Sequence, residues 1–556
     1  MPSVRRTQAA VLVATLAAGC TQPALDHGAQ LEGLIAGYIE ARYSESTTPR
    51  DLRAAAFVGR IAADRILLAQ LRDVATGSLS RSQRIDRAYL IGALEADIFD
   101  AETARRWETD PTTYIPAGSI AAALDATAAE PMPASRQQLL ALLEGIPPAV
   151  EAARANLGSP PRRFTEAAIF EISATLAALR ERRSPTPGAQ IDPLLVDATD
   201  VAIEALHGFE GYLRNVVLPR SDGDWAIGTE RYDYLVQHRW MLDADADAIL
   251  ERGQRAFDET EARAQEVAER IAPGMHWIDV YESIKDDHPP FDAIKDAYQS
   301  QMDAARAFVR ERQVVTLPDS EHVVTVDTPL AMRRSSPFGT FQTVRPFDDG
   351  VEGRLVLTPI DAELPADQRL ARSRSHHHAW TPIIAVHEAY PGHHVHALKA
   401  RDNPRPLRRV AAEPITLEGW GLFTESLMFE LGFLAGDEVE LTILRNRLWR
   451  AARVILDVSL HTGRMGIRQA VDFLVDRVRF ERSAAELEVG MYPRRPTYVL
   501  GYLIGMQEIE RLRDDWVAAN GPPNPPSTLY DALLSAGGIP PALIRAELLG
   551  EETPEP

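Results

Sequence analysis

The sequence predicts a mainly α-helical protein: one large helical body, with a small β-sheet inserted before the helix that carries His387. Three observations indicate this fold class. Ala, Leu, Arg and Glu recur with a period near 3.6 over most of residues 31–310. Short runs rich in β-branched or aromatic residues, separated by turn signals, lie within residues 314–360. Helical periodicity then returns from Pro382 to the C-terminus.

Size and composition are those of a globular protein. The 556 residues are 45% hydrophobic and 25% charged, which excludes a disordered or collagen-like chain. Acidic residues outnumber basic ones by 80 to 59, so the net charge is −21. Proteins that bind nucleic acids normally carry a basic surface, and we therefore expect no nucleic-acid partner. No feature of the sequence predicts an oligomeric state.

Residues 1–20 have the features of an export signal. Two arginines precede the apolar run 9–18, which is too short for a permanent membrane span of about 20 residues. Residues 16–20, Leu-Ala-Ala-Gly-Cys, resemble the lipobox of bacterial lipoproteins, in which the cysteine is acylated and becomes the N-terminus. Cys20 is the only cysteine, so no disulfide is expected. The alternative is a plain signal peptide with an incidental cysteine.

This segment predicts an exported protein, either an outer-membrane lipoprotein or a periplasmic one. The lipid on Cys20 would be its only contact with a membrane. Thr21 and Gln22 follow the cysteine where an aspartate would signal retention at the inner membrane. By resemblance to other lipoproteins of bacteria with two membranes, this favours the outer membrane.

The chain after the signal divides into three regions. A helical N-terminal region spans 21–313, a β segment spans 314–360, and a helical C-terminal region spans 361–556. Helical periodicity is clearest at 53–74 and 165–183. The strands expected in the β segment are 322–326, 341–344 and 354–357. A final helix-turn-helix is expected around the Gly537-Gly538 turn.

Residues 387–394, His-Glu-Ala-Tyr-Pro-Gly-His-His, carry the strongest chemical signal. Thr381 can cap a helix whose first residue is Pro382, and His387 then lies on the buried stripe of that helix. A His-Glu pair on a helix, with another histidine on the following turn, is typical of zinc hydrolases, in which glutamate activates a zinc-bound water. The pattern predicts one zinc ion per chain, with His387 as a ligand and Glu388 as general base.

The second histidine departs from the usual His-Glu-x-x-His spacing, because Pro391 occupies that position. The proline ring clashes with the carbonyl four residues earlier, and Gly392 permits an unusual backbone at the next step. The resulting bulge could return His393 to the metal, whereas His394 lies on the correct face of an ideal helix but two turns away. We favour His393, because other zinc peptidases place glycine directly before the second histidine.

Catalytic zinc usually has three protein ligands and one open position, so a downstream carboxylate is expected. Residues 418–425, Glu-Gly-Trp-Gly-Leu-Phe-Thr-Glu, resemble the helix that supplies the third ligand in aminopeptidase N-type gluzincins. Glu418 would be that ligand, and Glu425, on the same helix face, could support the site. With Thr416 as N-cap, Glu418 falls in the first helical turn, so complementing the helix dipole is its alternative role.

The two motifs together resemble the bacterial family called domain of unknown function 885. Through it the chain is similar to gluzincin metallopeptidases such as the Taq-type carboxypeptidases. The resemblance extends over about residues 30–545 and is sharpest at 380–505. It implies a mainly helical body with a deep cleft and a zinc-dependent peptidase activity.

Peptide hydrolysis also needs a group that stabilises the oxyanion. Asp457 and His461 lie four residues apart on one helix face, where Asp457 could fix the tautomer of His461; a surface helix pair is the alternative. Tyr498 and Tyr502 have the same spacing, and paired tyrosines near the metal occur in several gluzincins. A buried tyrosine stripe is the alternative for this pair.

Arg494 and Arg495 stand out in an acidic chain. A guanidinium group can bind a carboxylate through two hydrogen bonds. Either arginine could therefore hold the C-terminus of a peptide substrate, and a solvated loop is the alternative.

The predicted function is a zinc metallopeptidase of the cell envelope that hydrolyses short peptides. The preference for short peptides rests on the family resemblance alone. One alternative keeps the zinc and changes the substrate, giving an amidohydrolase that acts on non-peptide amides or modified amino acids. The other is a non-catalytic helical envelope lipoprotein that binds partners.

Overall fold

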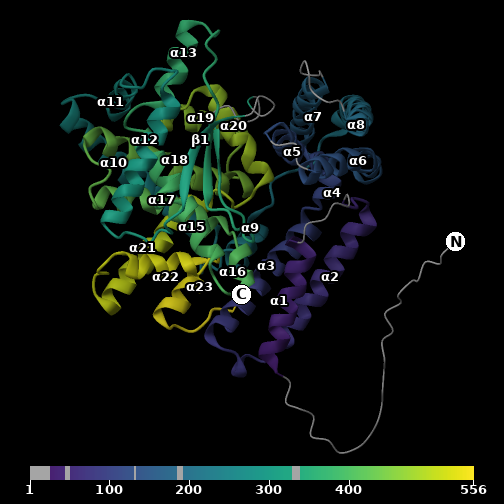
Figure 1. Cartoon of the computed structure of the whole chain (residues 1–556), viewed down its shortest axis with the longest axis horizontal. Helices are drawn as coiled ribbons and strands as arrows, with labels where there is room; N and C mark the ends of the chain where they lie inside the picture. The colour runs from purple at the N-terminus through teal and green to yellow at the C-terminus, as the bar shows by residue number, and fades with distance from the viewer. Residues whose placement is uncertain are drawn as a thin grey trace, which may run out of the picture.

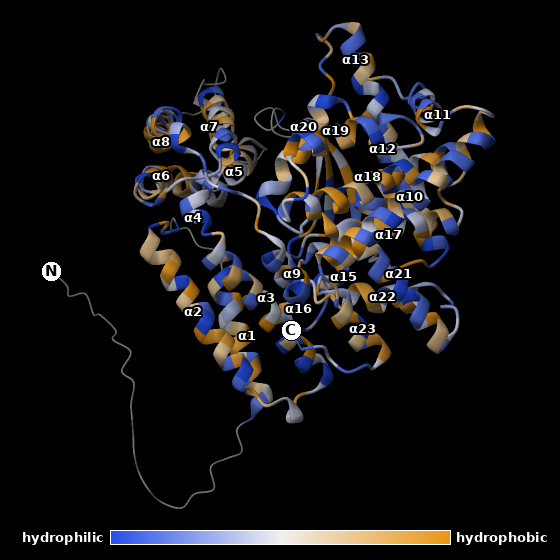
Figure 2. Cartoon of the chain, turned by 180° about the vertical axis from the view of Figure 1, so that it is seen from behind, coloured by the Kyte–Doolittle hydropathy of each residue, from blue (hydrophilic) through white to orange (hydrophobic). Residues whose placement is uncertain are grey.

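The computed structural model describes residues 26–43, 50–129, 133–183, 192–328, 333 and 339–555. The described chain is mainly α-helical, which confirms the predicted fold class (Figure 1). Its helices carry hydrophobic and hydrophilic residues side by side, as amphipathic helices do (Figure 2). The export signal and Cys20 lie outside the described residues. Among the helices of the described part, none has the length and apolar character needed to span a bilayer.

The N-terminal part is a group of three long helices, α1 (His27–Tyr43), α2 (Ala54–Asp73) and α3 (Arg81–Thr103). Figure 1 places them side by side, and α2 coincides with the periodicity at 53–74. The start of α3 is fixed by a capping box. Ser80 accepts a hydrogen bond from the backbone of Gln83, whose side chain in turn accepts one from the backbone of Ser80.

The next helices build a hydrophobic core of their own, which lies to one side of the main body (Figure 1). Large buried side chains such as Trp107, Tyr114 and Phe209 fill it. Its elements are α4 (Arg106–Thr109), η2 (Pro111–Tyr114), α5 (Ala117–Ala129), α6 (Pro133–Asn156), α7 (Arg162–Arg183), α8 (Pro193–Tyr212), η3 (Leu213–Val217) and η4 (Leu218–Arg220). The predicted helix at 165–183 is the greater part of α7.

The main body contains the larger core, where α10 packs along α18 and α17 packs along α21. Its first helices are α9 (Thr229–His238), α10 (Ala246–Ile271), α11 (Trp277–Ile284) and α12 (Ile294–Glu311). After the sheet come α13 (Ala366–Ser373), η6 (Arg374–His376), α14 (Thr381–Ile384), η7 (Ala385–Ala389), α15 (His393–Arg401), α16 (Pro406–Val410) and α17 (Pro414–Glu430). The last elements are α18 (Asp437–His461), α19 (Ile467–Val478), α20 (Arg482–Met491), η8 (Tyr492–Arg494), α21 (Leu500–Asn520), α22 (Ser527–Ser535) and α23 (Pro541–Leu549).

A three-stranded sheet lies within residues 314–360, where the sequence predicts it. Its strands are β1 (His322–Asp327), β2 (Gly339–Gln342) and β3 (Glu352–Leu357). The central strand β3 pairs in parallel with β1 and antiparallel with β2. Gly353 of β3 passes so close to His394 that a Cβ atom there would lie 2.6 Å from the imidazole Nδ1. The sheet therefore packs directly against the histidine motif.

Two helices begin earlier than the sequence predicts. Thr381 is the first residue of α14 and not its N-cap, which is Trp380. Likewise, α17 begins at Pro414, a residue whose fixed φ suits the first helical position. Thr416 is therefore inside the helix, where its hydroxyl donates to the carbonyl of Ile539. The predicted cap at Thr416 is wrong, and Glu418 lies in the second helical turn.

Candidate metal centre

The helix that carries His387 is distorted as Pro391 and Gly392 predict. After α14, residues 385–389 form the π-helical turn η7, and the chain becomes extended at Tyr390 before α15 begins. The amide of Gly392 donates to the carbonyl of Val386 at 3.0 Å. A Cβ atom at Gly392 would lie 1.8 Å from the carbonyl oxygen of His387, so this turn requires glycine.

The turn brings His393 against His387 and Glu418. One side-chain donor atom from each of the three residues lies within 4.8 Å of the other two, a grouping found nowhere else in the described part of the chain. The Glu418 Oε2 atom is 3.8 Å from His387 Nε2 and 3.5 Å from His393 Nε2. Two imidazoles and a carboxylate are a donor set typical of catalytic zinc.

His394 points to a different part of the structure. Its Nε2 atom lies 3.4 Å from Glu321, which is fully buried. The Glu321 carboxylate also accepts hydrogen bonds from Tyr390 at 2.7 Å and from Arg306 at 2.6 Å. Of the two histidines that the sequence leaves open, His393 faces the candidate metal centre and His394 belongs to this buried network.

Helix α17 fixes the orientation of the His387 ring. The Glu425 carboxylate lies 2.9 Å from His387 Nδ1, and because a carboxylate only accepts, Nδ1 carries the hydrogen. Nε2 is thereby left facing Glu418. Gly421 lies between these two glutamates in the sequence, and a Cβ atom there would come within 2.8 Å of His387 Nε2. The imidazole of His387 fits at this position because Gly421 has no side chain.

The electrostatics of the cluster favour positive charge. Burial alone would lower the pKa of His387, but hydrogen bonds to Glu418 and Glu425 outweigh burial and raise the pKa to about 10. Burial would also raise the pKa of Glu418, yet the two imidazoles hold it well below its usual range. Glu388, half-buried in η7, adds negative charge close to His387. A metal cation at this position would balance the negative charge of Glu418 and Glu425, as a proton on His387 does.

Tyr498 and Tyr502 reach the cluster from the start of α21. The Tyr498 hydroxyl donates to Glu418 Oε1 at 3.2 Å, and the two tyrosine rings meet edge to face at 6.5 Å. Burial, followed by the negative charge of Glu418, raises the pKa of both hydroxyls. The predicted tyrosine pair thus borders the candidate metal centre.

Asp457 and His461 lie elsewhere in the core. Both are fully buried, so the surface-pair alternative is wrong. Asp457 accepts hydrogen bonds from Tyr232 at 2.7 Å and from the backbone amide of Thr497 at 2.9 Å, and His461 Nε2 lies 3.0 Å from the carbonyl of Tyr492. Asp457 therefore anchors the segment that precedes Tyr498, and the structure does not bring His461 to the three candidate ligands.

The two adjacent arginines have different surroundings. Arg494 donates to Asp110 and Glu171, each at 3.1 Å, so its guanidinium is committed to ion pairs with the second core. These partners leave the Arg494 guanidinium less available to a substrate carboxylate than the sequence suggests. Arg495 is exposed and lies over the Tyr498 ring, 5.3 Å from the ring centroid. It remains a candidate for substrate binding.

Sequence reasoning missed Arg450 of α18. Its side chain is 6% exposed, yet two of its guanidinium nitrogens have no hydrogen-bond partner among the described residues. Burial lowers the pKa of Arg450, and the negative charge of Glu425 opposes that shift. Its guanidinium lies over the Trp449 ring, 4.2 Å from the ring centroid. Arg450 lies among Arg445, Arg447 and Arg453, and such a run predicts a solvated helix face. Its burial follows only from the packing of α18.

Comparisons with known proteins identify a family from the sequence and similar solved structures from the fold. The family model of bacterial proteins of unknown function, DUF885, matches residues 34–548. A candidate lipoprotein of unknown function from Shewanella oneidensis has a similar solved structure, with a TM-score of 0.78 and 20% identity over 95% of this chain and 100% of that chain. A candidate lipoprotein from Colwellia psychrerythraea is also similar, with a TM-score of 0.76 and 16% identity over 94% of this chain and 98% of that chain. No curated protein matches the sequence.

Proposed function

The chain belongs to the DUF885 family of bacterial proteins, and we propose that it is a zinc-dependent peptidase of the cell envelope that hydrolyses short peptides. One observation carries this proposal. His387, His393 and Glu418 each bring one donor atom within 4.8 Å of the other two, although they come from a distorted helical turn, the helix after it and a third helix. Glu388 adjoins the first of these ligands, as the general base does in zinc hydrolases.

The residues present fit zinc. The set of two imidazoles and one carboxylate matches the ligands of catalytic zinc sites, which keep a fourth position for water or substrate. Glu425 holds the Nδ1–H of His387 and so directs Nε2 to the ion, the usual support for a zinc-bound histidine. Gly421 leaves the space that the imidazole needs.

Several residues of the chain have separate roles in the proposed hydrolysis. Bound zinc supplies Lewis-acid chemistry, lowering the pKa of a water molecule and polarising the substrate carbonyl. Glu388 accepts the proton of the attacking water and passes it to the leaving amine. The Tyr498 hydroxyl, now bonded to Glu418, donates to the carbonyl oxygen as negative charge develops there. Tyr502 packs against Tyr498 and keeps it in place.

Export is the second part of the proposal. The export signal and the lipobox at residues 16–20 support transfer across the inner membrane and acylation of Cys20. The peptidase then acts in the periplasm or at the outer membrane, held by a lipid on Cys20. Radiolabelled palmitate incorporated by the wild type and absent from the Cys20→Ser variant would support this anchor, and no label in either protein would exclude it.

Zinc content is the first test of the proposed site. The protein is made as a soluble form that begins at Thr21, and zinc per chain is measured by elemental analysis. We expect one zinc ion in the wild type and its loss in His387→Ala, His393→Ala and Glu418→Ala. His207→Ala, at an exposed histidine of α8, is the matched control and should keep its zinc. A wild type that takes up no zinc even when zinc is supplied contradicts the proposal.

Activity is tested with a library of short peptides. Glu388→Gln should keep one zinc ion per chain and lose hydrolysis by at least about 100-fold, since general-base catalysis contributes roughly that much. Zinc-loaded wild type that cleaves amide conjugates and no peptide would favour the amidohydrolase alternative. Wild-type activity on both classes that survives in Glu388→Gln would remove this glutamate from the mechanism.

A further inference from the structure

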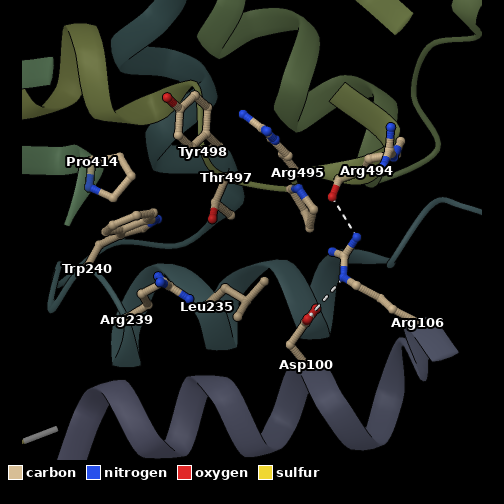
Figure 3. Close-up of a pocket in the computed structure, with 11 residues that line it drawn as sticks. Asp100, Arg106, Leu235, Arg239, Trp240, Pro414, Arg494, Arg495, Thr497 and Tyr498 are labelled. Atoms are coloured by element: carbon tan, nitrogen blue, oxygen red, sulfur yellow. Dashed lines mark hydrogen bonds and ion pairs between the residues drawn. The ribbon is translucent and has the colours of Figure 1, made fainter. Parts of the chain in front are cut away.

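A cavity of about 210 Å³ lies beside the candidate metal centre, where the N-terminal helices meet the start of α21 (Figure 3). Tyr498 forms part of its wall, and the hydroxyl of this tyrosine reaches Glu418. Trp240 and Pro414 contribute apolar surface. The lining also carries several arginines, an unusual concentration of positive charge in a chain with a net charge of −21.

Most of these arginines already have partners. Arg106 donates to Asp100 at 3.2 Å, and Arg239 donates to Glu413 at 3.1 Å. Arg495 differs, because the described residues place no carboxylate oxygen within 4.0 Å of its guanidinium. Figure 3 shows the side chain of Arg495 beside Tyr498, whereas the side chain of Arg494 points away from that tyrosine. Arg495 is therefore the arginine of this cavity that can pair with a ligand.

We propose that this cavity binds a carboxylate of the substrate through Arg495; this inference rests on the proposed peptidase function. A guanidinium group recognises a carboxylate through two parallel hydrogen bonds. The ring of Trp240 and the side of Pro414 cover the apolar part of the same substrate residue. The substrates are therefore peptides that carry a carboxylate near the bond that is cleaved.

The geometry limits how near that bond lies. Tyr498 contacts both groups: its hydroxyl is 3.2 Å from Glu418, and its ring centroid is 5.3 Å from the Arg495 guanidinium carbon. An extended peptide advances about 3.5 Å per residue. A carboxylate held by Arg495 therefore places a peptide bond one to three residues away at the metal centre. For a C-terminal carboxylate, the activity is that of a carboxypeptidase or dipeptidase.

Ligand binding tests the cavity separately from catalysis. Calorimetry on the soluble full chain compares N-acetylphenylalanine with its amide, and includes N-acetylaspartate α-amide, whose only carboxylate is on the side chain. We expect the free acid to bind at least about 10-fold more tightly than the amide, an advantage of the size of one charge-assisted pair. Tight binding of the aspartate derivative instead assigns the cavity to acidic side chains.

Variants identify the residue responsible. Arg495→Gln should remove the preference for the acid, and Arg495→Lys should restore part of it. Arg231→Gln, at an exposed arginine of α9 outside the cavity, should leave it unchanged. The same titrations in the His387→Ala background exclude binding of the carboxylate to zinc. A preference that survives in Arg495→Gln, or no preference in the wild type, overturns the inference, whatever the outcome for peptidase activity.

Discussion

At the scale of single residues, Gly421 is a position where an added side chain would directly disturb the candidate metal centre. A Cβ atom there would lie 2.7 Å from His387 Cε1, so Gly421→Ala must displace the imidazole or the helix. We expect a destabilisation of about 1–3 kcal/mol, typical of overpacking, and loss of bound zinc. Zinc analysis and urea unfolding measure the two effects.

A matched glycine on another helix separates this contact from helix propensity. Among the described residues, no atom outside the local helix backbone lies within 4 Å of the position that a Cβ of Gly490, in α20, would take. Gly490→Ala should keep its zinc and be neutral or up to about 1 kcal/mol more stable. Equal zinc content in the two alanine variants would show that Gly421 is not needed for the site.

Glu425 provides a second prediction at this scale. Its carboxylate accepts the Nδ1–H of His387 and lies near the buried Arg450. Glu425→Gln keeps the shape of the side chain and removes its charge. Zinc affinity should fall by about 10- to 100-fold, the usual effect of losing the partner of a metal-binding histidine. Competition with a calibrated chelator measures this affinity, and an unchanged value would contradict the role given to Glu425.

His377 gives a prediction about pH. It is fully buried, and burial lowers its pKa to about 3. As the pH falls from about 6.5 toward 3, the unfolded chain takes up a proton on His377 that the folded chain does not. The free energy of unfolding is therefore highest, as far as His377 contributes to it, above pH 6.5, and it decreases as the pH falls toward 3. Between pH 7 and pH 5 the wild type should lose about 2 kcal/mol more stability than His377→Gln.

Urea unfolding with a chelator present compares the two proteins without a contribution from zinc. His378→Gln is the matched control, because the side chain of His378 is largely exposed. It should show the same pH dependence as the wild type. Parallel curves for wild type and His377→Gln would show that His377 is charged in the folded protein or that its site opens before the chain unfolds.

Residue-level prediction from sequence succeeded where the signal is local. The Pro391-Gly392 step predicts a bulge that turns His393 back, and the structure contains that bulge. The partners of Arg494 are Asp110 and Glu171, more than 300 residues away, and no local pattern announces them. Glu321 was missed for the same reason: it lies just before β1, without a motif, and meets Tyr390 only in the folded chain.

At the scale of elements, the packing of α17 against α21 joins the candidate ligand Glu418 to the tyrosine pair. Gly505 permits it, because a Cβ atom there would lie 2.0 Å from the carbonyl oxygen of Ile415. Gly505→Ala should separate the two helices and destabilise the fold by about 1–3 kcal/mol. The distance between Glu418 and Tyr498 should then increase, so peptide hydrolysis falls more than zinc content. Loss of zinc without loss of stability would contradict this account.

Hydrophobic periodicity predicts which helices and strands form better than it predicts the residues at which they begin and end. The long helices α2 and α7 and the positions of β1 and β3 are predicted from the sequence, because the residue composition and spacing of these segments favour those elements. The start of α17 is not predicted correctly. Thr416 is a good N-cap by residue type, but its hydroxyl donates to the carbonyl of Ile539 and the helix begins at Pro414. A tertiary contact thus overrides a local preference.

At the scale of the whole molecule, the described chain has two hydrophobic cores, and the arginine pair lies where they meet. Arg494 donates to Asp110 and Glu171 of the smaller core, whereas Arg495 faces the cavity beside Tyr498. Arg494 thus joins the two parts, and the guanidinium of Arg495 is left facing the cavity. We therefore expect the position of the α5–α8 group relative to the candidate metal centre to depend on Arg494.

This arrangement predicts opposite effects for two adjacent substitutions. Arg494→Gln leaves Asp110 and Glu171 without their cation, and it should destabilise the protein by about 1–3 kcal/mol and speed hydrogen exchange in α7. Exchange in α17 should stay slow and zinc should be retained, because Glu418 is untouched. Arg495→Gln should change stability by less than about 0.5 kcal/mol and affect carboxylate binding alone. Faster exchange in α7 in both variants would mean that Arg495, too, helps to hold the cores together and is not reserved for the ligand.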